Sequence, residues 1–141
     1  MQENKLLYRM QANATVGRRT RVTSRDGELK LDVTVPPELG GTNGRGTTPE
    51  QLFAATCAAS LLSIVRLTAL RHEIVLPNDA AVDAVVGLRM MANLFSIEVE
   101  LVLRLPGLPR DDSEILATEA YRIFPYRELA GQNHSLKLTV A

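Results

Sequence analysis

The chain has 141 residues, a length that fits one domain, residues 1–141, with a sizeable core. Its 16 basic and 16 acidic residues cancel, which argues against nucleic acid or an anionic membrane surface as the main partner. We expect no signal peptide and no segment with the roughly 18 consecutive apolar residues of a membrane span. A single cysteine suits a reducing compartment, so the composition predicts a soluble, cytoplasmic protein without a membrane or nucleic-acid partner.

Alternating apolar and polar residues predict several strands, and a long apolar run that follows a glycine-rich loop predicts a central helix. Asp26-Gly27 is typical of a hairpin turn, and Ala92-Asn93 separates two long strands. The elements expected in chain order are strands at 6–16, 21–24 and 28–35, a helix at 49–71, strands at 82–91 and 94–105, a helix capped by Asp111-Asp112-Ser113 and ending near Ile123, and a strand at 135–140. This order predicts an α+β domain.

The helix that begins at Pro49 is the most informative part of the sequence. Thr48 is suited to cap it, Pro49 fits the first helical position, and Glu50 lies in the first turn, where the helix dipole favours a carboxylate. Beyond Glu50 the helix is apolar almost all round, so we expect it to be buried on most sides. Its thiol, Cys57, lies one turn before Ser60.

Four segments together carry a family resemblance. They are Gly17-Arg18, Val35-Pro36 with Leu39-Gly40-Gly41, the string from Gly46 to Ala55 that contains PEQLFAA, and the string from Ala120 to Tyr126. With this layout the chain resembles the organic hydroperoxide resistance (Ohr) proteins of the OsmC-like family over nearly its whole length. The resemblance implies an OsmC/Ohr-like fold in which a buried central helix packs on antiparallel strands.

The resemblance also implies a function and an assembly. The family consists of thiol peroxidases that form intertwined homodimers with two active sites at the interface. A peroxidatic cysteine on the central helix is activated by an arginine that a glutamate holds in place, and a resolving cysteine forms a disulfide that a lipoyl-type dithiol reduces. By position, Arg18 and Glu50 match the activating pair. The peroxidatic position is Ser60 and the resolving position is Phe124, so both family cysteines are missing.

Ser60 cannot replace a peroxidatic thiol, because its hydroxyl is far less acidic and oxygen has no sulfenic state. We expect Ser60 to be a core hydroxyl bonded to a carbonyl one turn earlier. A serine nucleophile would need an activating histidine, and neither His72 nor His134 is placed to act as one.

Cys57 has two interpretations. It follows Glu50 by seven residues and points in nearly the same direction, so it could lie within reach of Arg18. Alternatively it is a small buried hydrophobe, as most unpaired cysteines are. Arg18 and Glu50 are themselves expected to form a salt bridge, which either holds the N-terminal turn to the helix or lines a pocket that favours anions.

Two functional hypotheses follow. In the first, the chain is a peroxidase for organic hydroperoxides that uses Cys57 and an external thiol or dithiol reductant. In the second, it is a catalytically silent homodimer that binds a lipid-like or other apolar molecule beside Arg18, Glu50 and Ser60. We predict a protein associated with hydroperoxide detoxification that lacks the two-cysteine reaction, and we expect no cofactor or metal.

Overall fold

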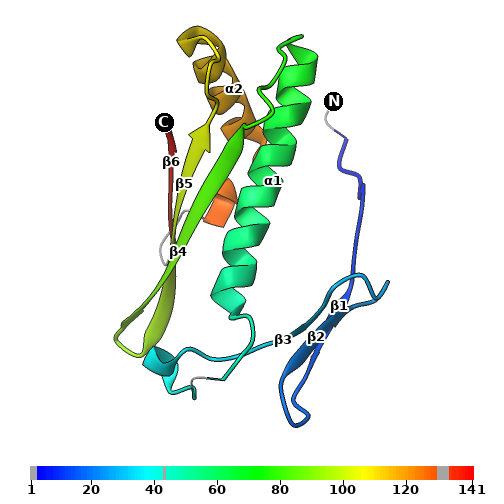
Figure 1. Ribbon diagram of the computed structural model, residues 1–141, viewed down its shortest axis with the longest axis vertical. Coiled ribbons are helices and arrows are strands. Elements are labelled where there is room, and N and C mark those ends of the chain that lie inside the picture. The colour runs from blue at the N-terminus through cyan, green and yellow to red at the C-terminus, as the bar shows by residue number, and fades with distance from the viewer. Residues whose placement is uncertain (1–2, 43, 130–133) are drawn as a thin grey trace. The chain divides into compact units, whose positions relative to one another are not determined.

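The computed structural model describes residues 3–42, 44–129 and 134–141. Its backbone contacts divide the chain into two compact units, Met1–Pro49 and Glu50–Ala141, which we describe separately. Figure 1 shows the elements of both units. The chain is an α+β protein with two α-helices and two three-stranded sheets among the described residues.

The N-terminal unit contains a small antiparallel sheet in the order β1-β2-β3. Its strands are β1 (Ala12–Thr15), β2 (Arg21–Ser24) and β3 (Lys30–Asp32), and a 3-10 helix η1 (Pro37–Leu39) follows them. The expected turn at Asp26-Gly27 is confirmed, with Gly27 at a φ of 79°. The Ser24 hydroxyl donates a hydrogen bond to Asp26 (2.5 Å), and this bond lowers the pKa of the Asp26 carboxyl.

Two strands of this unit are shorter than the sequence predicts. The alternation over 6–16 gives a strand at Ala12–Thr15 alone, because β2 offers four residues for pairing and Ala12 already lies opposite Ser24. The strand expected at 28–35 covers Lys30–Asp32, and Val33 continues it through an isolated bridge to Thr47. Alternation predicts which residues can form a strand, whereas the length of the neighbouring strand decides how many do.

The C-terminal unit contains a long helix, a three-stranded sheet and a shorter helix. The elements are α1 (Pro49–Arg71), β4 (Ala81–Met91), β5 (Leu94–Arg104), α2 (Arg110–Ile123), the 3-10 helix η2 (Pro125–Leu129) and β6 (His134–Val140). The hairpin β4–β5 is antiparallel, and its two-residue loop places Ala92 and Asn93 at positive φ, as a tight hairpin requires. β6 pairs parallel to β5, so the sheet is mixed rather than purely antiparallel as expected.

The predicted cap of the second helix is wrong by a few residues. α2 begins at Arg110, directly after Pro109, and no side chain caps it. Asp111 and Asp112 instead lie in the first turn, where their charges favour the helix dipole. Ser113 is buried one turn into the helix. Because proline is compatible with a helix start, α2 begins directly after Pro109, slightly nearer the N-terminus than the sequence predicts.

The core of this unit is formed by one stripe of α1 together with β5 and α2. Its buried residues are Cys57, Leu61, Val65, Ala69, Val99, Leu101, Leu103, Leu105, Leu116, Ala117, Ala120 and Phe124. The spacing of Cys57, Leu61 and Val65 by four residues keeps these side chains on one face of the helix. The expected aliphatic core is therefore present, with Phe124 as its one aromatic member.

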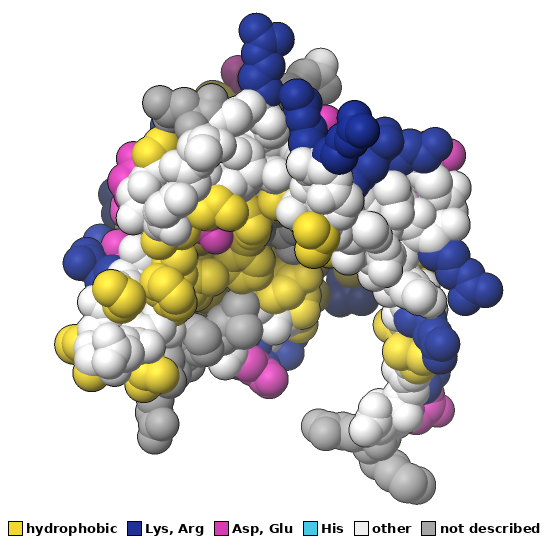
Figure 2. Space-filling model, turned by 90° about the horizontal axis from the view of Figure 1, so that it is seen from below, with side chains coloured by type: hydrophobic (Ala, Val, Ile, Leu, Met, Phe, Trp, Pro, Cys, Tyr) yellow, Lys and Arg dark blue, Asp and Glu magenta, His cyan; other side chains and the backbone are white. Residues whose placement is uncertain are grey.

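The opposite face of α1 is not buried within the C-terminal unit, whereas the sequence predicts that most sides of the helix are covered. Ala55, Ala59 and Ser63 are exposed on that face, as are Leu67 and Leu70 further along the helix. Figure 2 shows other hydrophobic side chains that remain uncovered on the face seen from below. α1 is also long and apolar enough to cross a membrane by length and composition, which the sequence reasoning did not expect.

Candidate functional site

The site implied by the resemblance is built on the N-terminal half of α1. The loop before the helix is anchored to the small sheet, since the Thr47 N–H donates to the Asp32 carbonyl (2.9 Å) and the Thr34 N–H donates to the Thr47 carbonyl (3.0 Å). A side chain at Gly46 would place Cβ 2.9 Å from the Asp32 carbonyl oxygen, so glycine is required there. The loop leads into Pro49, and Glu50 follows in the first turn as a half-buried carboxylate.

Cys57 lies in the core rather than in an accessible site. Its side chain is fully buried on the stripe that continues with Leu61 and Val65. Burial raises the pKa of the Cys57 thiol, because the surroundings disfavour the charged thiolate. A reactive cysteine is expected to be partly exposed and to have a lowered pKa. The geometry of Cys57 is therefore that of a structural cysteine.

Ser60 lies one turn after Cys57 and is half-buried. The expected hydrogen bond from its hydroxyl to a carbonyl one turn earlier is absent from the described part of the chain. Three other hydroxyls of α1 make such bonds instead, each to the carbonyl four residues earlier: Thr56, Ser63 and Thr68. The Ser60 hydroxyl is therefore not held by the helix backbone.

Phe124 occupies the position that corresponds to the resolving cysteine, and its side chain is fully buried. It forms the C-cap of α2, and its ring meets Tyr126 edge to face, with ring centroids 5.6 Å apart. Tyr126 makes a second such contact with Phe53 on α1, at 6.0 Å. We call Phe53, Phe124 and Tyr126 the aromatic cluster. It connects the first half of α1 to the segment after α2, and the sequence reasoning did not predict it.

Arg18 belongs to the N-terminal unit, in the turn after β1, and its side chain is exposed there. Gly17, which precedes it, has a positive φ of 46° that permits this tight turn. Glu50, Cys57 and Ser60 belong to the other unit. The salt bridge between Arg18 and Glu50 therefore stays a prediction.

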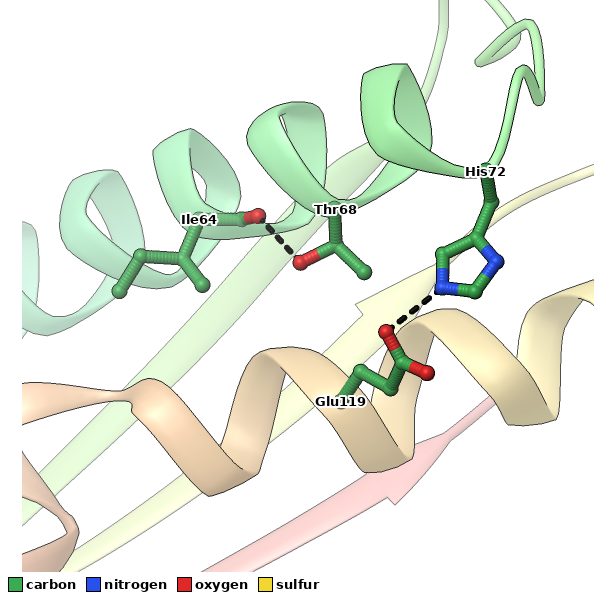
Figure 3. Close-up of polar contacts among 4 residues, drawn as sticks. All are labelled: Ile64, Thr68, His72 and Glu119. Atoms are coloured by element: carbon green, nitrogen blue, oxygen red, sulfur yellow. Dashed lines mark hydrogen bonds and ion pairs between the residues drawn. The ribbon is translucent and has the colours of Figure 1, made fainter. Parts of the chain in front are cut away.

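His72 is engaged at the far end of α1. Its Nε2 lies 2.6 Å from a carboxylate oxygen of Glu119 on α2, as Figure 3 shows, and both side chains are partly exposed. One turn earlier in α1 the buried Thr68 hydroxyl donates to the Ile64 carbonyl (2.9 Å), as Figure 3 also shows. His72 is twelve residues, or roughly 18 Å along the helix, from Ser60, so it cannot act as a base for that hydroxyl. The side chain of His134 lies outside the described residues.

The described residues contain no obvious metal site. Across residues 3–42, 44–129 and 134–141 no group of three or more His, Cys, Asp or Glu side chains is placed to hold a metal ion.

Comparisons with known proteins identify the family. The chain is 36% identical to the organic hydroperoxide resistance protein of Xanthomonas axonopodis pv. citri over 137 residues, which cover 97% of this chain and 96% of that protein. The chain belongs to the organic hydroperoxide resistance protein family. A scan against models of protein families gives no match.

Solved structures of Ohr proteins have the same fold. A crystal structure of an organic hydroperoxide resistance protein OsmC from Legionella pneumophila superimposes with a TM-score of 0.85 at 38% identity, covering 97% of this chain and 99% of that one. The structure of an organic hydroperoxide resistance protein from Elizabethkingia anophelis with bound thiocyanate superimposes with a TM-score of 0.86 at 34% identity. The match covers 98% of this chain and 99% of that one. The OsmC/Ohr-like fold is thereby confirmed.

Proposed function

We propose that this Ohr-family chain takes part in organic hydroperoxide resistance in the cytoplasm without performing the two-cysteine thiol peroxidase reaction. The names of its relatives support the first part of the proposal. The burial of its single cysteine supports the second part, because peroxide attack needs an accessible thiolate. Ser60 and Phe124 stand at the positions where the family resemblance places the two reacting sulfurs.

The chemistry at these two positions explains the proposal. A thiol peroxidase transfers one peroxide oxygen to a thiolate, releases the alcohol, and then resolves the sulfenic acid with a second thiol. The Ser60 hydroxyl has no redox cycle, and the Phe124 ring has no sulfur to close a disulfide. Cys57 could replace the first thiol alone, but burial raises its pKa and leaves it protonated at neutral pH.

Turnover assays test this proposal. With cumene hydroperoxide and dihydrolipoic acid, the wild-type chain should show negligible consumption of peroxide. The double variant Ser60→Cys with Phe124→Cys should recover part of the activity, whereas either single variant should recover less, since each restores one sulfur. Robust wild-type turnover that Cys57→Ser abolishes would contradict the proposal and would make Cys57 the peroxidatic residue.

Binding without turnover is the second candidate function. Ser60 is half-buried, and its hydroxyl donates to no backbone carbonyl, so this polar group on α1 is available to a ligand. An apolar, lipid-like molecule would suit such surroundings. Isothermal titration with oleic acid should then show saturable binding that Ser60→Phe weakens and that Thr118→Phe, at an exposed position of α2, does not. Equal binding by both variants would refute this site.

We further propose that the working form is a homodimer. The exposed face of α1 carries Ala55, Ala59, Leu67 and Leu70, which form an apolar surface that the rest of the C-terminal unit does not cover. Exposed apolar patches of this kind mark interfaces in soluble proteins. A second copy that covered this face would complete the burial that the sequence of the helix predicts.

A further inference from the structure

A cavity of about 500 Å³ lies at the beginning of α2, at the opposite end of that helix from Phe124. Its walls come from the loop between β5 and α2, from the first turns of α2, and from the end of β6. Leu105, Leu108 and Val140 give it apolar walls, and the Ala141 N–H, which donates to the Leu103 carbonyl (3.0 Å), fixes the end of β6. The volume is within the range of small-molecule sites.

Ser113 is the uncharged polar side chain that lines this cavity. Ser113 is only 7% exposed, yet it lines the cavity. Its backbone N–H donates to the Pro109 carbonyl (3.0 Å), whereas its hydroxyl has no hydrogen-bond partner among the described residues. Among the described residues, every side-chain oxygen that is fully buried has a hydrogen-bond partner. Because the Ser113 hydroxyl has no partner, it belongs to the small part of Ser113 that is still accessible to solvent. A hydroxyl in this position is available to a ligand.

The charges around the cavity favour an uncharged ligand. Arg110 and Glu114 both line it and form an ion pair with each other (3.0 Å), so their opposite charges largely compensate at the cavity. Asp111 and Asp112 lie in the same turn of α2, where they already balance the positive end of the helix dipole and repel an anion. A cation would have to compete with Arg110 for Glu114.

We propose that this cavity binds an uncharged small molecule with an apolar body and one oxygen atom, which accepts a hydrogen bond from Ser113. Alcohols and ketones of about ten non-hydrogen atoms have this chemistry. The site uses none of the residues of the aromatic cluster, and Ser113 precedes Phe124 by eleven residues, or roughly 16 Å along α2. The inference is therefore independent of the proposed function.

Nuclear magnetic resonance can test this site with 2-phenyl-2-propanol as the probe. Titration of the full-length protein should shift the backbone amide signals of Leu108, Ser113 and Glu114 in a saturable way. Ser113→Ala should weaken binding by about 2- to 10-fold, the effect of one lost hydrogen bond. Thr118→Ala is the matched control, since Thr118 is exposed on α2 and does not line the cavity, and it should leave the affinity unchanged.

A second variant and two charged probes complete the test. Val140→Phe narrows the cavity from β6 and should abolish the shifts, while the spectrum shows that the variant is folded. Benzoate and benzylammonium should bind more weakly than the alcohol. The inference is overturned if the alcohol produces no saturable shifts at these amides, if Ser113→Ala binds as well as wild type, or if either ion binds as tightly.

Discussion

The ring of Tyr126 meets the ring of Phe53 edge to face, with centroids 6.0 Å apart and ring planes at 76°. This contact joins the first half of α1 to the segment after α2, and Phe124 also meets Tyr126 edge to face. A position that the family resemblance assigns to a resolving cysteine is thus part of an aromatic cluster. Aromatic pairs add about 0.5–1.5 kcal/mol to the free energy of burial, so the cluster stabilises this end of the unit.

Replacement of Phe124 by a small residue should therefore destabilise the folded protein. Phe124→Ala should lower the free energy of unfolding by about 3–5 kcal/mol, because the ring is fully buried and its loss leaves a cavity. Urea denaturation followed by circular dichroism measures this change. Ile115 lies on the outer side of α2 and is 41% exposed, so Ile115→Ala should lower the free energy of unfolding by clearly less than Phe124→Ala does. A loss below about 1 kcal/mol for Phe124→Ala would contradict the close packing of this ring in the core.

Cys57 should be protected from thiol reagents. Because the thiol is buried and its pKa is raised, modification by 5,5′-dithiobis(2-nitrobenzoic acid) should be on the order of 100-fold slower in the native protein than in guanidinium chloride. A half-buried thiol introduced by Ser60→Cys in a Cys57→Ser background should react much faster. Rapid labelling of native Cys57 would show that the site is accessible.

The raised pKa of Cys57 also predicts a pH dependence with a definite sign. The folded state favours the protonated thiol, so this contribution to stability is complete below the ordinary thiol pKa of 9.0 and is lost as the pH rises above it. Wild type should therefore lose more stability than Cys57→Ala between about pH 8 and pH 10. Parallel stability curves for the two proteins would be evidence against a buried, protonated thiol.

Assembly should depend on the exposed face of α1. Sedimentation at micromolar concentration should show a dimer, and its interface should exceed the roughly 2,000 Å² typical of obligate dimers. Ala59→Arg should dissociate it, since an arginine on this face introduces bulk and charge into the proposed contact. Thr118→Arg, on an exposed position of α2, is the control and should leave the dimer intact. A wild-type monomer would refute the proposed assembly.

The strand pair β4–β5 carries an ion pair that can be titrated. A hydrogen bond from Arg89 (2.9 Å), together with its charge, lowers the pKa of the Glu98 carboxyl. The ion pair stabilises the folded protein when the pH is above the ordinary Glu pKa. This stabilisation is lost as the pH falls through the lowered pKa of Glu98. Arg89→Ala should therefore raise the Glu98 pKa, measured by carbon-detected resonance titration, and Arg110→Ala should not. An unchanged Glu98 pKa in Arg89→Ala would contradict this assignment.

The pair of Arg18 and Glu50 is tested by a double-mutant cycle. If the two side chains bind each other in the assembled protein, Arg18→Ala and Glu50→Ala should each lower the melting temperature, and the double variant should lower it by less than the sum. Additive effects would show that the two residues do not interact.

The sequence by itself determined most of the local structure. Pro49 set the start of α1, the β4–β5 hairpin followed from alternation on both sides of Ala92-Asn93, and α2 ended near Ile123 as expected. These features depend on local rules, which are the dihedral preferences of individual residues and the periodicity of their neighbours. The motifs at Gly46–Ala55 and Ala120–Tyr126 also identified the family.

Tertiary structure decided the rest. The lengths of β1 and β3 depend on what β2 can pair, and the parallel pairing of β6 with β5 depends on where α2 returns the chain. An apolar helix does not reveal which of its faces its own chain will cover, so only the fold showed that Cys57 is buried while Ala59 is exposed. The contact between Phe53 and Tyr126 joins residues 73 positions apart, a separation that no local pattern can encode.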